Sequence, residues 1–187
     1  MQSQQQQQQI PTKTLNALEQ DIILFFVQTN QKRIELKELL KIIFDRYRTY
    51  LPIEIMDSIV KLCKYEFFFL TSDTILVVDN VPLIIQTVMR FKRQITAYLL
   101  YYLVKQNSFA IRHNEPAIFD YKKIFYLPKL LEDKHIYKVY ELYYEKDKKL
   151  WDAMNELKRK GYLIKIGKSK YNFRYDLLPV EIRRFLV

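Results

Sequence analysis

Glycine is almost missing from this 187-residue chain, which has only Gly161 and Gly167. Phosphate-binding loops and dinucleotide-binding fingerprints need several closely spaced glycines, because backbone N–H groups must come close to the phosphates. Two glycines at these positions cannot form either motif. The sequence therefore excludes the nucleotide-binding classes that depend on such loops.

Cysteine and histidine are equally scarce, since the chain has one cysteine, Cys63, and two histidines, His113 and His135. A zinc site needs clustered Cys and His ligands, and these three are far apart in sequence. Cys63 lies in the apolar stretch 59–63, which is typical of a buried structural thiol, and a lone cysteine fits a reducing, intracellular compartment. The tract Glu-Asp-Lys-His at 132–135 has an interleaved lysine and predicts a solvated turn instead of a metal cluster.

The sequence also lacks a catalytic constellation. No serine lies in a nucleophile-elbow context, and the surroundings of Cys63 and of the two histidines do not suit a nucleophile and its base. We therefore expect a protein that is not an enzyme, with no catalytic residues, no cofactor and no metal.

Long apolar runs are absent as well. The longest, residues 97–104, is far short of the ~20 residues that span a bilayer, so no membrane partner is expected. The N-terminus has six consecutive glutamines at 4–9 and lacks the basic start and apolar core of a signal peptide. Because such a polar tract cannot bury enough apolar surface to order itself, residues 1–14 are predicted to be a disordered Gln-rich tail.

Apolar side chains are plentiful, at 49% of all residues, which is ample for a folded core. They recur at helical spacing from Leu15 to about Asn30, from Leu36 up to the break at Pro52, and from just after Pro52 to near residue 65. β-rich residues on either side of a turn at 71–73 then predict a hairpin over 67–78. Three helices followed by a hairpin is the plan of a winged helix-turn-helix domain.

The same plan recurs downstream. Residues 22–27 match residues 99–104 at an offset of 77, and residues 62–67 match residues 157–162 at an offset of 95. The second offset also superposes the turn at Ser72-Asp73 on Gly167-Lys168. The difference of 18 predicts an insertion between the first and third helices of the second unit, in the irregular stretch near 108–128.

The second unit ends in the clearest hairpin of the chain. Gly167 and Ser169 make its turn, and apolar residues alternate along both predicted strands: Tyr162, Ile164 and Ile166, then Tyr171, Phe173 and Tyr175. Between the units Pro82 suits a helix start, and no proline or glycine interrupts the chain from Leu83 to Gln106. A helical connector could therefore run straight into the first helix of the second unit.

These patterns predict a mostly α fold with small β wings (α+β), built from two tandem winged helix-turn-helix domains. The tail at 1–14 precedes a first winged-helix domain at 15–80. A helical connector at 81–94 leads to a second winged-helix domain at 95–187, which contains the insertion near 108–128.

Positive charge is concentrated in the second unit. The chain as a whole carries +10, but residues 1–80 have 9 basic and 10 acidic side chains, whereas residues 81–187 have 22 and 11. The outward face of the third helix in the first unit is predicted to carry Glu54, Asp57, Ser58, Lys61 and Lys64, with Met56, Ile59, Val60 and Cys63 facing inward. The wing of this unit also carries Asp73 and Asp79, and such a face would sit badly against phosphates and favours a protein partner.

The best candidate for binding nucleic acid is a basic tract from 158 to 174 that has no acidic residue. Its cationic side chains are Lys158, Arg159, Lys160, Lys165, Lys168, Lys170 and Arg174. Lysines in this array suit sequence-independent contacts with phosphates, and the same surface also suits an acidic protein partner. The third helix of this unit carries Asp152 and Glu156 as well, which weakens the DNA-binding interpretation.

Two winged helices in tandem, with an insertion in the second, resemble the C-terminal half of the Stn subunit of the CST telomere complex. The tracts Met56 to Val78 and Met154 to Tyr175 carry this resemblance. The Gln run and the abundance of Lys, Tyr, Ile and Phe look like a ciliate protein, in which the related subunit travels with telomerase.

The resemblance implies a nuclear protein at the chromosome end, with protein partners among CST or telomerase subunits and DNA polymerase alpha-primase. It implies a role in telomere maintenance and C-strand synthesis, with nucleic acid as a further partner through the second winged helix. The family's N-terminal OB-fold would be absent, so the chain would be a domain excerpt. The alternative is a DNA-binding transcription regulator or a subunit of the transcription apparatus, which would usually present Arg, Asn or Ser on a recognition helix free of carboxylates.

Overall fold

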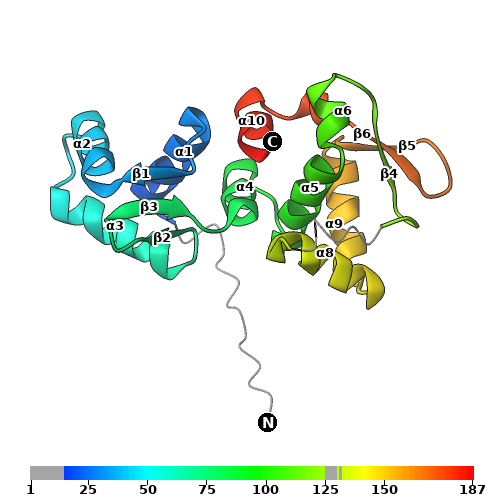
Figure 1. The fold of residues 1–187 in the computed structure, drawn as a ribbon, viewed down its shortest axis with the longest axis horizontal. Helices are drawn as coiled ribbons and strands as arrows, with labels where there is room; N and C mark the ends of the chain where they lie inside the picture. The colour runs from blue at the N-terminus through cyan, green and yellow to red at the C-terminus, as the bar shows by residue number, and fades with distance from the viewer. Residues whose placement is uncertain (1–14, 125–129, 131) are drawn as a thin grey trace, which may run out of the picture.

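The computed structural model describes residues 15–124, 130 and 132–187, so the tail predicted at 1–14 lies outside the described residues. Helices dominate, and the strands form two separate three-stranded antiparallel sheets (Figure 1). The prediction of a mostly α chain with small β elements is confirmed.

The first unit runs from helix to strand to two helices and then to a hairpin. Its elements are α1 (Ala17–Thr29), β1 (Arg33–Glu35), α2 (Leu36–Arg46), α3 (Pro52–Lys64), β2 (Phe68–Leu70) and β3 (Ile75–Val78). The sequence did not predict β1, a three-residue strand that pairs with β3 and places Ile34 opposite the buried Leu76. The second helix was predicted to reach Pro52, but α2 ends at Arg46 because the backbone leaves the helical region at Tyr47.

The second unit repeats this order with one added helix, α6 (Ser108–Arg112), between its first helix and its first strand. Its elements are α5 (Gln94–Gln106), α6, β4 (Ala117–Asp120), α8 (Lys134–Tyr144), α9 (Lys148–Arg159), β5 (Leu163–Lys165) and β6 (Lys170–Phe173). A 3-10 turn, η2 (Tyr175–Leu177), and a last helix, α10 (Val180–Leu186), follow. The strand order is β4-β6-β5 here and β1-β3-β2 in the first unit, so the third strand lies in the middle of both sheets. The stretch 108–128 was predicted to be irregular, and this is wrong for α6 and β4, which lie within it.

Backbone hydrogen bonds recur in the two units at the offset of 95. The amide of Phe67 donates to the carbonyl of Leu62 in the first unit, and the amide of Tyr162 donates to that of Leu157 in the second. Between these partners Glu66 and Gly161 have positive φ angles of 66° and 85°. Each hairpin turn is closed by the same bond, Thr71 to Ile75 and Ile166 to Lys170, at 2.9 Å. Likewise α1 and α5 lie 77 residues apart along their whole length.

A polar contact joins the first and third helices at equivalent places in the two units. In the first, the buried Glu19 of α1 forms an ion pair with Lys61 of α3 at 3.0 Å. The repeat offsets place Thr96 at the position of Glu19 and Glu156 at that of Lys61. Glu156 is buried and accepts hydrogen bonds from Thr96 Oγ1 at 2.6 Å and from the Lys92 amide at 2.8 Å. The sequence had suggested that Glu156 lies on the basic surface, and this is wrong because its side chain is buried.

The connector is not one continuous helix. α4 (Val81–Met89) begins with the predicted proline, Pro82, in its first turn, and the side chain of Asn80 caps it by accepting from the Leu83 amide. It ends where Arg90 takes a left-handed conformation with φ of 56°. Phe91 is then buried, and the next helix starts at Gln94. The prediction of one continuous helix from Leu83 to Gln106 is wrong. Arg90, although it is not a glycine, takes the left-handed conformation that ends α4.

Two short helices pack between the units. Figure 1 shows α4 and α10 in the centre of the elongated molecule, and both contact α1 on one side and α5 on the other. Their buried apolar residues, among them Ile84, Ile85, Ile182 and Phe185, belong to one core that continues through both units. The relative placement of the two units therefore rests on apolar packing as well as on chain connectivity.

Replacing Glu156 with alanine should lower the free energy of unfolding by about 2–3 kcal/mol, because it leaves the Lys92 amide and the Thr96 hydroxyl without their acceptor. Urea denaturation followed by circular dichroism measures this. Glu156→Gln keeps one acceptor oxygen and should lose less. A loss below about 0.5 kcal/mol for the alanine variant, which is the level of an ordinary surface change, would contradict this role.

Candidate nucleic-acid interface

The end of α9 and the hairpin that follows it carry all seven predicted cationic residues. Lys158, Arg159 and Lys160 form the end of the helix, and Lys165, Lys168 and Lys170 lie on the β5–β6 hairpin. Arg174 follows β6 directly. The seven therefore belong to one helix–hairpin segment, although their side chains differ in exposure and in partners.

The three hairpin lysines are exposed. Gly167 and Lys168 occupy the turn, as predicted, and Lys165 lies opposite Tyr171 in the pairing of β5 with β6. Lys170 lies opposite Asp120 of the neighbouring strand β4. These ammonium groups are the part of the basic tract best placed to meet an external anion.

A carboxylate reaches this surface from a distant part of the chain. Asp120 accepts a hydrogen bond from Ser169 Oγ at 2.8 Å, and this bond, with Lys123 and Lys170 nearby, lowers the pKa of its carboxyl group. The tract 158–174 has no acidic residue of its own, but the pairing of β4 with β6 brings one to its edge. A linear sequence window cannot show this neighbour.

Lys158 and Lys160 lie over aromatic rings. The ammonium of Lys158 is 5.9 Å from the ring centre of Trp151 and 5.6 Å from that of Tyr171, and that of Lys160 is 5.6 Å from the ring of Phe91. Ring faces attract such cations, which restrains these two side chains against the end of α9.

Arg174 has a carboxylate partner within the chain. Its guanidinium donates to both carboxylate oxygens of Asp176, at 2.9 and 2.8 Å. The same contact raises the pKa of Arg174 and lowers that of Asp176. This two-pronged pair neutralises Arg174, so it is the weakest phosphate ligand of the seven.

The outer face of the second sheet is apolar. Ile164 pairs with Asn172 and Asn172 with Ile118, and the isoleucines are 44% and 52% exposed. Ile166 is 56% exposed beside them. On the inner face, Leu163 lies opposite Phe173, and both are buried. Of the residues that alternate along the hairpin, Tyr171, Phe173 and Tyr175 are buried, whereas Ile164 and Ile166 face outward.

The third helix of the first unit also presents apolar residues. Ile53 and Val60 are 65% and 55% exposed, and they alternate along α3 with the exposed Asp57 and Lys64. The prediction that Ser58 faces outward and Val60 inward is wrong, because the buried stripe consists of Ile55, Ser58, Ile59 and Leu62. At 100° per residue this stripe places Val60 on the opposite face of the helix.

The tract 132–135 starts a helix. Asp133 caps α8 by accepting from the His135 amide at 2.8 Å and also accepts from the hydroxyl of Tyr101 at 2.6 Å. His135 is buried beside the rings of Tyr98 and Tyr101, and this burial lowers its imidazole pKa. The prediction of a solvated turn is therefore wrong for the histidine.

The remaining scarce residues have structural surroundings. Cys63 is half-buried, and burial raises the pKa of its thiol, which disfavours the reactive thiolate. His113 is exposed and stacks on Phe109. Over residues 15–124, 130 and 132–187, no three His, Cys, Asp or Glu residues are grouped as metal ligands. Within the same part of the chain, every helix is too short or too polar to span a bilayer.

The two faces of β5 should respond differently to substitution. Leu163→Ala removes a buried side chain and should cost about 3 kcal/mol of unfolding free energy. The double variant Ile164→Thr and Ile166→Thr changes exposed side chains, so each substitution should alter the free energy of unfolding by no more than about 0.5 kcal/mol. Urea denaturation of the three proteins measures both. The reverse order would overturn the strand register.

Comparisons with models of protein families, with curated proteins and with solved structures find no match to this chain. The arrangement of its own residues must therefore support any function proposed for it.

Proposed function

We propose that this chain is a non-catalytic interaction module made of two winged helices, at 15–80 and 95–187, joined by the connector at 81–94. One observation carries the proposal: the two units share element order and strand order, but their third helices and hairpins expose different chemistry. Winged helices contact partners through these two elements, and the side chains on them select the partner.

The second unit is proposed to contact the phosphate backbone of nucleic acid. The exposed ammonium groups of Lys165, Lys168 and Lys170 supply positive charge without the planar, two-pronged geometry that reads bases. Binding of this kind depends on salt and little on sequence. The burial of Glu156 removes one of the two carboxylates that counted against this surface.

The first unit is proposed to contact protein. Its third helix combines the exposed apolar side chains of Ile53 and Val60 with the carboxylates of Glu54 and Asp57. Carboxylates repel phosphates, and apolar side chains gain most from a partner that removes them from water. This combination favours a protein surface over DNA.

The setting proposed for both contacts is a telomere- or telomerase-associated complex of the CST type in the nucleus. Its support is the resemblance of tandem winged helices with an insertion in the second. In Figure 1, α3 and the β5–β6 hairpin lie toward opposite ends of the long axis. A module of this shape suits a bridge between a protein such as DNA polymerase alpha-primase and a nucleic acid strand.

The triple variant Lys165→Glu, Lys168→Glu and Lys170→Glu should weaken binding to single- and double-stranded DNA. It should also flatten the salt dependence, because each lost phosphate contact removes roughly 0.7 to 0.9 from the slope of log affinity against log salt. Fluorescence anisotropy with labelled oligonucleotides over a range of salt concentrations measures both effects.

A matched control carries the same charge change on the first unit, at the exposed Lys37, Lys41 and Lys64. This control should keep most of the affinity and the slope. Unchanged DNA binding in the hairpin variant, or an equal loss in both variants, would refute a specific role for the hairpin.

The variant Ile53→Ser and Val60→Ser should lose a protein partner that the unchanged chain recovers from nuclear extract after nuclease treatment. Immunoblotting for DNA polymerase alpha-primase and telomerase subunits identifies what is recovered. The control, Leu177→Ser and Val180→Ser, alters two exposed apolar side chains of the second unit and should retain the partner. Loss of every partner on nuclease treatment alone would favour the alternative, a DNA-tethered transcription factor.

A further inference from the structure

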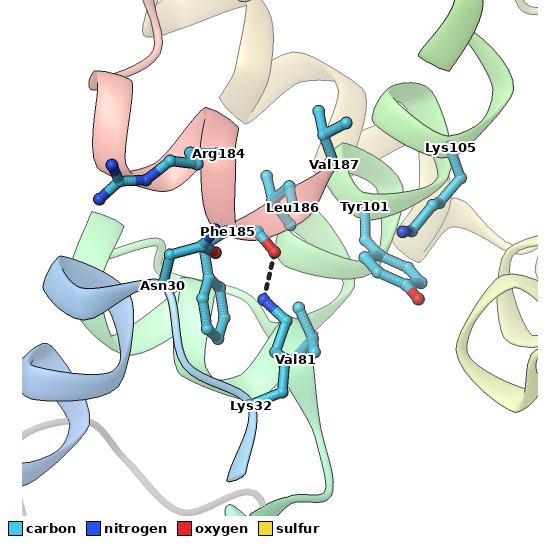
Figure 2. A pocket seen from close by; sticks show the side chains of 9 residues that line it. All are labelled: Asn30, Lys32, Val81, Tyr101, Lys105, Arg184, Phe185, Leu186 and Val187. Carbon is cyan, nitrogen blue, oxygen red and sulfur yellow. Dashed lines mark hydrogen bonds between the residues drawn. The ribbon is translucent and has the colours of Figure 1, made fainter.

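A pocket of about 330 Å³ lies between the two units, away from the third helices and the hairpins. Figure 2 shows its walls: the segment after α1 with Asn30 and Lys32, the start of α4, the side of α5 with Tyr101 and Lys105, and the end of α10. The pocket therefore exists only because α4 and α10 hold the two units together.

Three cationic side chains line this pocket, namely Lys32, Lys105 and Arg184. They come from the first unit, from α5 and from α10. The ion pairs within residues 15–124, 130 and 132–187 include none of the three. Instead, Lys32 donates to the carbonyl oxygen of Phe185, and Arg184 donates to the carbonyl oxygen of Gln28 at 3.1 Å.

The ammonium of Lys32 is drawn in against the protein. It lies 3.1 Å from the centre of the Phe185 ring, and Figure 2 shows it pointing into the pocket toward the end of α10. Removal from water, together with the positive charge of Lys105, lowers its pKa to about 7. Two cations that disfavour each other in one cavity would both gain from a shared anion.

The other charged groups nearby leave the pocket positive. Arg112 disfavours the charge of Lys105, and burial acts in the same direction. Asp133 favours it, but this carboxylate is already occupied by the hydroxyl of Tyr101. The described side chains that line the pocket include no carboxylate, and the negative group on its walls is the terminal carboxylate of Val187, set against the three cationic side chains.

We infer that this pocket binds a small oxyanion with two negative charges, of the phosphate monoester class. Its size admits such a group, and the ammonium groups of Lys32 and Lys105, on two walls, can donate hydrogen bonds to its oxygens, whereas the guanidinium of Arg184 points away from the space between them (Figure 2). The anion would bridge Lys32 of the first unit and Lys105 of the second, and so strengthen the contact between the units. This inference does not depend on nucleic-acid binding by the hairpin.

Binding should carry a proton signature. Lys32 is about half-charged near neutral pH, and a bound dianion favours its charged form, so its pKa rises on binding. At pH values between the pKa of Lys32 in the free protein and its pKa in the complex, binding is accompanied by uptake of a proton. The affinity for the anion therefore falls as the pH rises above about 7. Sulfate stays doubly charged over this range, so any proton taken up on sulfate binding belongs to the protein.

Isothermal titration calorimetry with inorganic phosphate and with sulfate, each in two buffers of different ionisation enthalpy, tests the inference on the whole chain. The unchanged protein should bind one anion, with net proton uptake in the sulfate titration; inorganic phosphate loses a proton of its own when its dianion binds near neutral pH, so its titration reports affinity alone. Lys105→Gln should weaken binding by about tenfold or more, through loss of a charge-assisted contact. Lys32→Gln should weaken binding to a similar extent and abolish the proton uptake.

The control Lys41→Gln removes an exposed charge from α2 in the first unit and should leave anion binding unchanged. Because Lys32 packs on Phe185, its variant could fail to fold; Lys105→Gln, which removes no hydrogen bond of the pocket, then decides the result. No saturable binding at millimolar anion, or unchanged affinity in Lys105→Gln, overturns the inference. A failure of the hairpin variants in DNA binding leaves this result untouched, and the reverse is also true.

Discussion

The packing of α4 and α10 between α1 and α5 is the contact on which the rest of the structure depends. These two short helices bury apolar side chains against both units, so a single core runs through the molecule. Without it the chain would be two small domains on a linker, free to turn. With it, the third helix of one unit and the hairpin of the other keep a constant separation and direction.

The two units show how one backbone plan can carry different surfaces. The hydrogen bonds that end the third helix and close the hairpin recur at the offset of 95, and a polar contact joins the first and third helices at equivalent positions in both units. That contact is Glu19 with Lys61 in one unit and Thr96 with Glu156 in the other. Since a buried polar group needs a partner, the two positions have changed together in chemistry while staying paired.

The net charge of +10 describes no single surface. Arg174 is neutralised by Asp176, and Lys158 and Lys160 lie over aromatic rings, which leaves the hairpin lysines as the most available cations of the basic tract. Lys32 and Lys105 form a second positive site between the units, made by residues 73 positions apart in the chain. The first site faces outward on a hairpin, and the second lies in an open pocket between packed helices.

The sequence by itself determined the local elements and their repetition. Helical periodicity located α1, α3 and α5 closely, and turn residues located both hairpins, because these features depend on neighbours within a few positions. It also located the seven cations of the helix–hairpin segment. The direction of side chains was predicted less well: on α3, Val60 was assigned to the inner face and Ser58 to the outer one, and the structure shows the reverse. The polarity of a side chain does not by itself decide which face of a helix it lies on.

Only the tertiary structure decided what depends on distant segments. β1 and β4 are too short for periodicity and exist because a partner strand completes their hydrogen bonds. Glu156 is buried because Thr96 and the Lys92 amide meet it, and Asp120 reaches the basic hairpin through strand pairing. The pocket around Lys32 likewise arises where four segments distant in sequence meet through apolar packing. Sequence patterns over a few neighbouring positions do not reveal such a meeting.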